Sequence, residues 1–120
     1  MEDILLLEDY KIYQDMMVGQ IPEGLTHRLV SNGHEFEKYL ADGGQARLYF
    51  LDDEVQDASG TDGFHFIKHC SHLLKQRPEA KVFYHGSIPL REEFAYCEKH
   101  NIQLINRSRI GDIIRQELAK

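Results

Sequence analysis

The sequence predicts an α/β protein in which helices cover both faces of a parallel sheet. Short apolar runs alternate with segments of helical periodicity along the whole 120-residue chain, which is the βαβ pattern of such a sheet. The clearest run, at 48–51, is aromatic in its middle and stops against Asp52, Asp53 and Glu54. A strand this apolar is buried on both faces. Open sheets of this class bind ligands at the carboxyl ends of their strands, so these acids indicate a functional site.

Five strands are predicted, each followed by a helix. The strands are the apolar runs at 4–7, 28–30, 48–51, 82–84 and 102–105. The first helix is expected from Tyr10 to Gln20. The second helix is capped by Ser31 or Asn32, whose side chains can accept a hydrogen bond from the first turn, and Gly43 follows its end.

The three remaining helices are identified by their caps and apolar stripes. Thr61 or Asp62 is expected to cap the third helix, which continues to about residue 76. Ser87 is a candidate cap for the fourth, in which Phe94 and Cys97 are expected to pack inward. The last helix is expected to begin near residue 108 and to face the core with its isoleucines. Together the elements predict a doubly wound sheet.

Composition and charge narrow the functional classes. The net charge of −6 argues against direct binding to nucleic acid, which requires clustered Lys and Arg. No apolar run approaches the roughly 18 residues of a membrane span, and the acidic N-terminus is unlike a signal peptide. We therefore expect a single cytoplasmic domain, residues 1–120. Cys70 and Cys97 are expected to be reduced, with a disulfide between them as the less favoured alternative.

A second acidic pair, Glu8-Asp9, directly follows the first predicted strand. In the flavodoxin-like strand order 2-1-3-4-5, the first and third strands are neighbours and their carboxyl ends meet at the topological switch point. Glu8, Asp9 and Asp52 would then share one crevice, with Asp53 as a further candidate. Carboxylates this close repel one another, so the cluster calls for a cation or a shared proton. Carboxylate oxygens suit Mg²⁺.

At these positions the chain resembles the CheY-like receiver domains of bacterial response regulators. The residues that carry the resemblance are Glu8-Asp9, Asp52, Asp62-Gly63 at the start of the third helix, and Arg107 after the fifth strand. The resemblance covers the whole chain and implies the strand order 2-1-3-4-5. It also implies that the acid after the third strand accepts a phosphoryl group from the histidine of a kinase or phosphotransfer protein.

The resemblance assigns a role to each acid. Asp52 is the expected phosphoacceptor because it directly follows the apolar run, and Asp53 is the alternative. The expected Mg²⁺ ligands are Glu8, Asp9, Asp52 and the backbone carbonyl of Glu54. A carboxylate can attack phosphorus to give an acyl phosphate, while the metal and a neighbouring cation offset the charge of the phosphoryl oxygens.

Three positions depart from the family pattern and indicate a divergent receiver. Arg107 stands where the family has lysine, and its planar fork differs from an ammonium in shape. Ungapped counting places His85 where the family has a threonine or serine, whereas Ser87 supplies the hydroxyl after a small shift. Leu104 replaces the aromatic residue of the fifth strand.

Three histidines of the third helix, His65, His69 and His72, have a spacing that resembles that of metal ligands. Their positions lie opposite the apolar stripe, so we expect them to face solvent. In sequence, no carboxylate or cysteine joins them at ligand spacing.

Three functions compete. The first is a phosphorylated switch that engages a downstream protein through its fourth helix, fifth strand and fifth helix, without turnover of external substrates. The second is a pseudo-receiver that binds proteins without phosphorylation. The third is a Mg²⁺-dependent phosphatase of the haloacid dehalogenase type. It is poorly supported, since Asp52-Asp53-Glu54-Val55-Gln56 lacks the Asp-x-Asp-x-Thr pattern and follows the third strand instead of the first.

Overall fold

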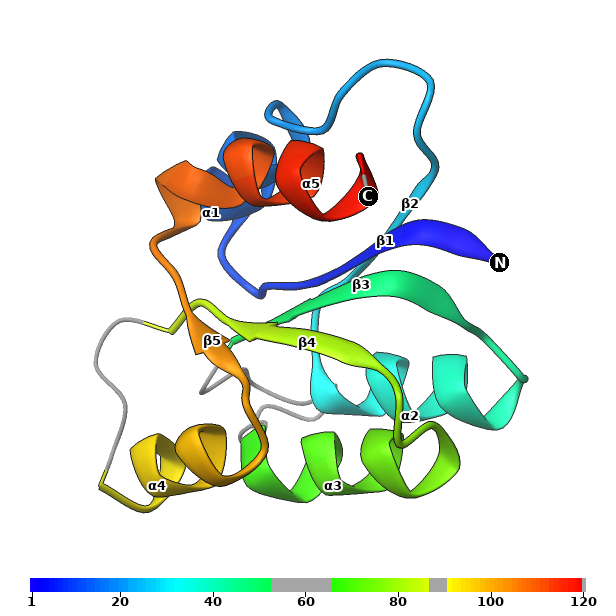
Figure 1. Ribbon diagram of the computed structural model, residues 1–120. Helices are drawn as coiled ribbons and strands as arrows, with labels where there is room; N and C mark the ends of the chain where they lie inside the picture. The colour runs from blue at the N-terminus through cyan, green and yellow to red at the C-terminus, as the bar shows by residue number, and fades with distance from the viewer. Residues whose placement is uncertain (53–65, 87–90, 120) are drawn as a thin grey trace.

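The fold is a three-layer α/β sandwich (Figure 1). The structure is a computed structural model that describes residues 1–52, 66–86 and 91–119. Within these ranges, five parallel strands form one sheet in the order β2-β1-β3-β4-β5. The strands are β1 (Glu2–Leu7), β2 (His27–Val30), β3 (Ala46–Leu51), β4 (Lys81–Tyr84) and β5 (Gln103–Leu104). The predicted fold class and strand order are confirmed.

The helices divide between the two faces of the sheet. One face is covered by α1 (Lys11–Val18) and α5 (Ile110–Leu118), and the other by α2 (Gly33–Ala41), α3 (Phe66–Gln76) and α4 (Arg91–Lys99) (Figure 1). A short 3₁₀ helix, η1 (Arg107–Arg109), leads from β5 into α5. This arrangement covers both faces of the parallel sheet, as its apolar strands require.

Strand β1 lies between β2 and β3 in the sheet and contributes to two cores. Its residue Leu5 pairs with Tyr49 of β3, and Leu6 pairs with Phe50. Because successive side chains of a strand point to opposite faces, Leu5 and Tyr49 pack beneath α2 and α3, whereas Leu6 and Phe50 pack beneath α1 and α5. All four side chains are fully buried, which explains why these strands read as continuous apolar runs.

Helix α2 begins and ends where its sequence signals predict. The side chain of Asn32 accepts a hydrogen bond from the backbone N–H of Glu35 at 2.8 Å, so Asn32, and not Ser31, is the cap. After the helix ends, Gly43 adopts a φ of 83°, a conformation that costs glycine little. The next residue, Gly44, lies directly against the ring of Tyr39.

Several expectations about the other elements need correction. Helix α1 is shorter than predicted at both ends, and β5 is limited to two exposed residues. Phe94 was expected to pack inward, but half of its surface is exposed, because α4 buries the face that carries Cys97. The predicted caps Thr61 or Asp62 of the third helix and Ser87 of the fourth lie outside the described residues.

The two cysteines are buried free thiols. Burial raises the pKa of Cys70 to about 12 and that of Cys97 to about 11, which keeps both protonated and unreactive at neutral pH. Among the described helices, none has the length and apolar character to cross a bilayer.

Candidate functional site

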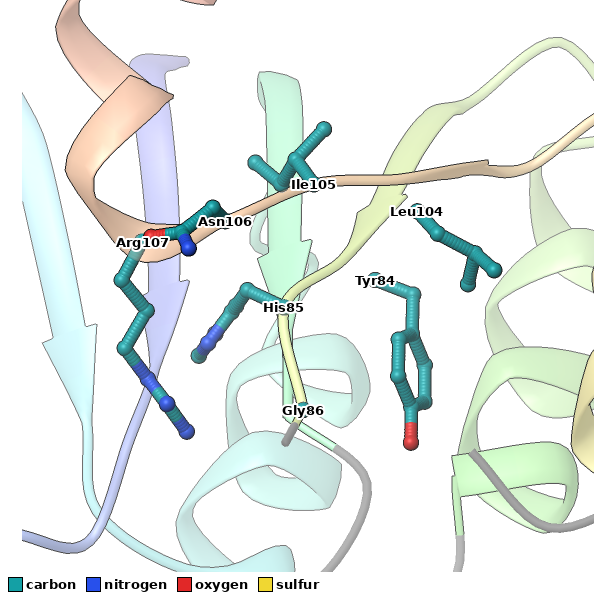
Figure 2. A pocket seen from close by; sticks show the side chains of 7 residues that line it. All are labelled: Tyr84, His85, Gly86, Leu104, Ile105, Asn106 and Arg107. Carbon is teal, nitrogen blue, oxygen red and sulfur yellow. The ribbon is translucent and has the colours of Figure 1, made fainter. Parts of the chain in front are cut away.

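The site is built from residues that directly follow the ends of neighbouring strands. Glu8 follows β1, Asp52 follows β3 and His85 follows β4, while Arg107 begins η1 shortly after β5. The carboxyl ends of parallel strands lie at one edge of the sheet, so these residues meet there. Figure 2 shows the side chains of His85 and Arg107 close together beside a pocket formed by residues 84–86 and 104–107. Tyr84 extends away from them.

Arg107 joins the two carboxylates of this edge. Its Nε donates a hydrogen bond to Glu8 Oε1 at 2.9 Å, and its Nη2 donates to Asp52 Oδ2 at 3.4 Å. The guanidinium also lies over the ring of Tyr13 of α1, 4.3 Å from the ring centroid, which is a favourable cation–π distance. Arg107 therefore brings one positive charge to two carboxylates of the acidic cluster.

Glu8 is a buried carboxylate with several stabilising contacts. Only 1% of its surface is exposed, and its Oε2 accepts a hydrogen bond from the backbone N–H of Tyr10 at 3.0 Å. Burial raises the pKa of Glu8 above its usual value, while the Tyr10 N–H and Arg107 act in the opposite direction. Asp52 is also buried, with 3% exposure. Arg107 therefore stabilises two charges that water reaches poorly.

His85 is fully buried in the wall of the site. Its Nε2 lies 2.9 Å from the carbonyl oxygen of Leu7, and since a carbonyl can only accept, Nε2 carries the proton. Its Nδ1 has no hydrogen-bond partner among the described residues and lies 3.9 Å from Glu8 Oε1. Burial, reinforced by the charge of Arg107, lowers the pKa of His85 to about 4, so the ring is neutral at pH 7 with a lone pair on Nδ1.

The geometry partly fits a divalent cation. A carboxylate oxygen of Glu8, one of Asp52 and a ring nitrogen of His85 all lie within 4.8 Å of one another. Two carboxylates suit Mg²⁺, whereas the unpartnered Nδ1 is a donor more typical of transition metals. A metal at this position would have to compete with Arg107 for the same oxygens. Asp9 is exposed and stands outside this trio.

Of the residues predicted from sequence, Glu8, Asp52 and Arg107 are brought together. Glu54, Ser87 and the alternative acceptor Asp53 lie outside the described residues. His85, which ungapped counting placed at the hydroxyl position, is in the site.

Sequence analysis missed two residues, Gln14 of α1 and Gln20, which lies shortly after that helix. The side chain of Gln14 donates a hydrogen bond to the carbonyl oxygen of Glu8 at 2.6 Å. Gln20 bridges to η1 and α5, because its Nε2 donates to the carbonyl oxygen of Arg107 at 2.8 Å and its Oε1 accepts from the N–H of Gly111 at 2.9 Å. Both residues resemble ordinary polar surface positions in the sequence, and no local pattern distinguishes them.

The histidines of α3 differ from the prediction. His69 is buried, with 7% exposure, so the expectation that it faces solvent is wrong. Its Nδ1 contacts Oε1 of Glu37, as does Nδ1 of the partly exposed His72. The error arose because α2 packs beside α3 and places the carboxylate of Glu37, which is distant in sequence, against these two histidines. His65 lies outside the described residues.

Comparison with known proteins identifies the fold. No protein-family model and no curated protein matches the sequence. Among solved structures, the chain is similar to a CheY-like response regulator receiver domain protein from Methanospirillum hungatei JF-1, with a TM-score of 0.76, 16% identity, and coverage of 99% of this chain and 94% of the other. The receiver domain of NtrX from Brucella abortus gives a TM-score of 0.74, 22% identity, and coverage of 98% and 99%.

A third structure, the BeF3-activated receiver domain of DrrB, gives a TM-score of 0.72 at 14% identity and covers 100% of this chain and 99% of the other. Longer response regulators are matched in part, since the chain covers 53% of DrrB from Thermotoga maritima and 26% of NtrX. The chain therefore has the fold of response regulator receiver domains.

Proposed function

We propose that this chain is a receiver domain of a two-component system and that Asp52 accepts a phosphoryl group from the histidine of a kinase or phosphotransfer protein. The observation that carries the proposal is the contact between Asp52 and Arg107 at the carboxyl end of β3. A guanidinium donates hydrogen bonds in a fork that matches phosphate oxygens. The group that neutralises Asp52 before transfer can therefore hold the phosphoryl group afterwards.

The transfer is a displacement at phosphorus. A carboxylate oxygen of Asp52 forms a bond to phosphorus while the bond from phosphorus to the donor nitrogen breaks, and the electron pair of that bond returns to the donor imidazole. Arg107 donates to the phosphoryl oxygens once Asp52 is modified. Glu8, Asp9, Asp52 and the carbonyl of Glu54 are the candidate ligands of Mg²⁺, which when bound offsets phosphoryl charge. Transfer ends on the chain itself, and no turnover of an external substrate is expected.

Arg107 also connects the site to a surface that can engage a protein. It begins η1, which continues directly into α5, so withdrawal of its side chain from Glu8 would alter the start of that helix. Phe94 of α4 and Leu104 of β5 are 50% and 38% exposed. The exposure of these apolar side chains supports the proposal that a downstream protein binds to the face formed by α4, β5 and α5. The acidic net charge of −6 disfavours nucleic acid as that partner.

The proposal is tested by intact-mass spectrometry after incubation with acetyl phosphate, with and without Mg²⁺. The wild type is expected to gain one phosphoryl group in a metal-dependent manner. Asp52→Asn should abolish the adduct, while the neighbouring Asp53→Asn serves as a matched control and should retain it. An adduct that persists in Asp52→Asn but disappears in Asp53→Asn would move the acceptor by one residue.

A second candidate, a phosphorylation-independent interaction module, is favoured by two specific observations. The buried ring of His85 occupies the wall where the resemblance calls for a hydroxyl, and Arg107 already spans both carboxylates. In this candidate, the ion pairs of Arg107 are structural and the α4–β5–α5 face binds its partner constitutively. Absence of any adduct, together with absence of Mg²⁺ binding in calorimetry, would select it over the first.

A further inference from the structure

A cluster of potential metal ligands lies between α2 and α3, apart from the site of Asp52. Glu37 belongs to α2, whereas His69 and His72 belong to α3. One ligand atom from each of the three side chains lies within 4.8 Å of the other two. Residues three apart on a helix share a face, so both imidazoles are presented toward the neighbouring helix.

The two imidazoles converge on one carboxylate oxygen. The Nδ1 atom of His69 lies 2.5 Å from Oε1 of Glu37, and the Nδ1 atom of His72 lies 2.8 Å from the same oxygen. In a tetrahedral zinc site with bonds of about 2.0–2.1 Å, neighbouring ligand atoms are separated by about 3.3 Å. To reach this separation, the distances from the two Nδ1 atoms to Oε1 of Glu37 would each have to increase by less than about 1 Å. Side-chain rotation of Glu37 and His72 can provide this, because both are partly exposed.

Packing fixes the more buried half of the cluster. The ring of His69 meets the ring of Phe36 edge to face, with centroids 6.3 Å apart, and Phe36 is fully buried. His69 therefore cannot rotate away without disturbing the core between α2 and α3. The partial exposure of His72 and Glu37 leaves one side of the cluster open to water. A buried, oriented nitrogen ligand and an open position are features of zinc sites with three protein ligands.

We propose that Glu37, His69 and His72 bind a transition-metal cation of the Zn²⁺ class, with water in the fourth position. Two imidazole nitrogens and one carboxylate favour Zn²⁺ over Mg²⁺ or Ca²⁺, which prefer oxygen ligands. The bound ion would join α2 to α3 on the face opposite α1 and α5. The inference is independent of phosphorylation, because it uses none of the residues around Asp52.

The test is calorimetric titration of the metal-stripped chain with Zn²⁺ in excess Mg²⁺, which keeps carboxylate-only sites occupied. One equivalent of Zn²⁺ is expected to bind at the cluster of Glu37, His69 and His72. Glu37→Gln and His72→Gln should each weaken binding by at least about 100-fold, since even outer-shell partners of a metal contribute about 10–100-fold. His34→Gln is the matched control: His34 is an exposed histidine of α2 outside the cluster, and its replacement should leave the affinity unchanged.

A second measurement separates metal binding from a purely structural contact. Co²⁺ added to the wild type should give the strong visible absorption of a tetrahedral complex, and His72→Gln should abolish it while far-ultraviolet circular dichroism remains unchanged. If the folded wild type binds no Zn²⁺, or if His72→Gln binds it as tightly as the wild type, the proposal is wrong and the three side chains form only a hydrogen-bonded bridge. Equal losses of Zn²⁺ affinity in His34→Gln and His72→Gln would also overturn the proposal.

Discussion

Replacement of Arg107 by glutamine should destabilise the protein far more than loss of an ordinary ion pair. Arg107 contacts Glu8 at 2.9 Å and Asp52 at 3.4 Å, and the side chains of these acids are only 1% and 5% exposed. Removal of one partner from a buried pair typically costs about 3–5 kcal/mol, because the remaining charge stays buried without compensation. The side chain of Arg107 is 15% exposed, so water can partly replace it. We therefore expect Arg107→Gln to lower the free energy of unfolding by about 3 kcal/mol, the lower end of this range.

The stability lost in Arg107→Gln should depend on pH in a predictable direction. Burial already raises the pKa of Glu8, and loss of Arg107 would raise it further. A carboxyl group with a raised pKa in the folded state binds a proton that the unfolded state releases, so its stabilising contribution is lost as pH rises through the folded pKa. The penalty of Arg107→Gln should therefore be smaller at pH 5 than at pH 8.

Urea unfolding followed by circular dichroism measures this loss as a lower midpoint at unchanged slope. The matched control is Arg109→Gln, two residues away. Arg109 pairs with Asp112 at 3.4 Å, and both side chains are more than half exposed, so the control should lose far less stability than Arg107→Gln. Equal losses in the two variants would refute the view that Arg107 compensates buried charge. Asp52→Asn introduced into Arg107→Gln should restore part of the loss, because it removes one of the uncompensated carboxylates.

Two further predictions concern His85 and Gly44. His85 has a folded pKa of about 4 against an ordinary value of 6.5, so its stabilising contribution is complete above pH 6.5 and is lost as pH falls toward 4, by about 3 kcal/mol in total. With a metal chelator present, the free energy of unfolding should fall less steeply over this pH range for His85→Gln than for the wild type. Equal slopes would contradict the lowered pKa of His85. At Gly44, an added Cβ would lie 2.5 Å from the ring of Tyr39. Gly44→Ala should therefore cost about 1–3 kcal/mol, seen as a lower melting temperature, whereas unchanged melting would show that the ring shifts freely.

The fold could be predicted from sequence because its signals are local. The apolar runs around Leu5 and Tyr49 indicate doubly covered strands, and Asn32 and Gly43 mark the ends of α2. The acids of the site could be predicted for the same reason, since each directly follows a strand and parallel topology gathers the strand ends. The face of α4 was assigned wrongly at Phe94 because a short amphipathic segment allows more than one rotation against the sheet.

Contacts between side chains on separate elements could not be predicted in this way. The hydrogen bonds of Arg107 span 99 and 55 residues of sequence, and the contacts of His69 and His72 with Glu37 span 32 and 35. Such pairings depend on how helices cross and how η1 approaches α1, which periodicity does not specify. The spacing of the histidines was visible in sequence, but the carboxylate that completes their cluster was on another helix.

The position of Arg107 gives a physical reason why the two functional candidates are difficult to separate by fold alone. Its guanidinium contacts Glu8 and Asp52 together, so one positive charge is shared between two buried carboxylates. A phosphoryl group on Asp52 would change that balance, because it adds anionic oxygens that compete with Glu8 for the same donors. Loss of the Glu8 contact would free the first residue of η1, and with it the start of α5. A constitutive module would keep both contacts at all times. In this chain, a switch therefore differs from a module in one contact. In a switch, Arg107 gives up its hydrogen bond to Glu8 in favour of a phosphoryl oxygen, whereas in a module it keeps that bond.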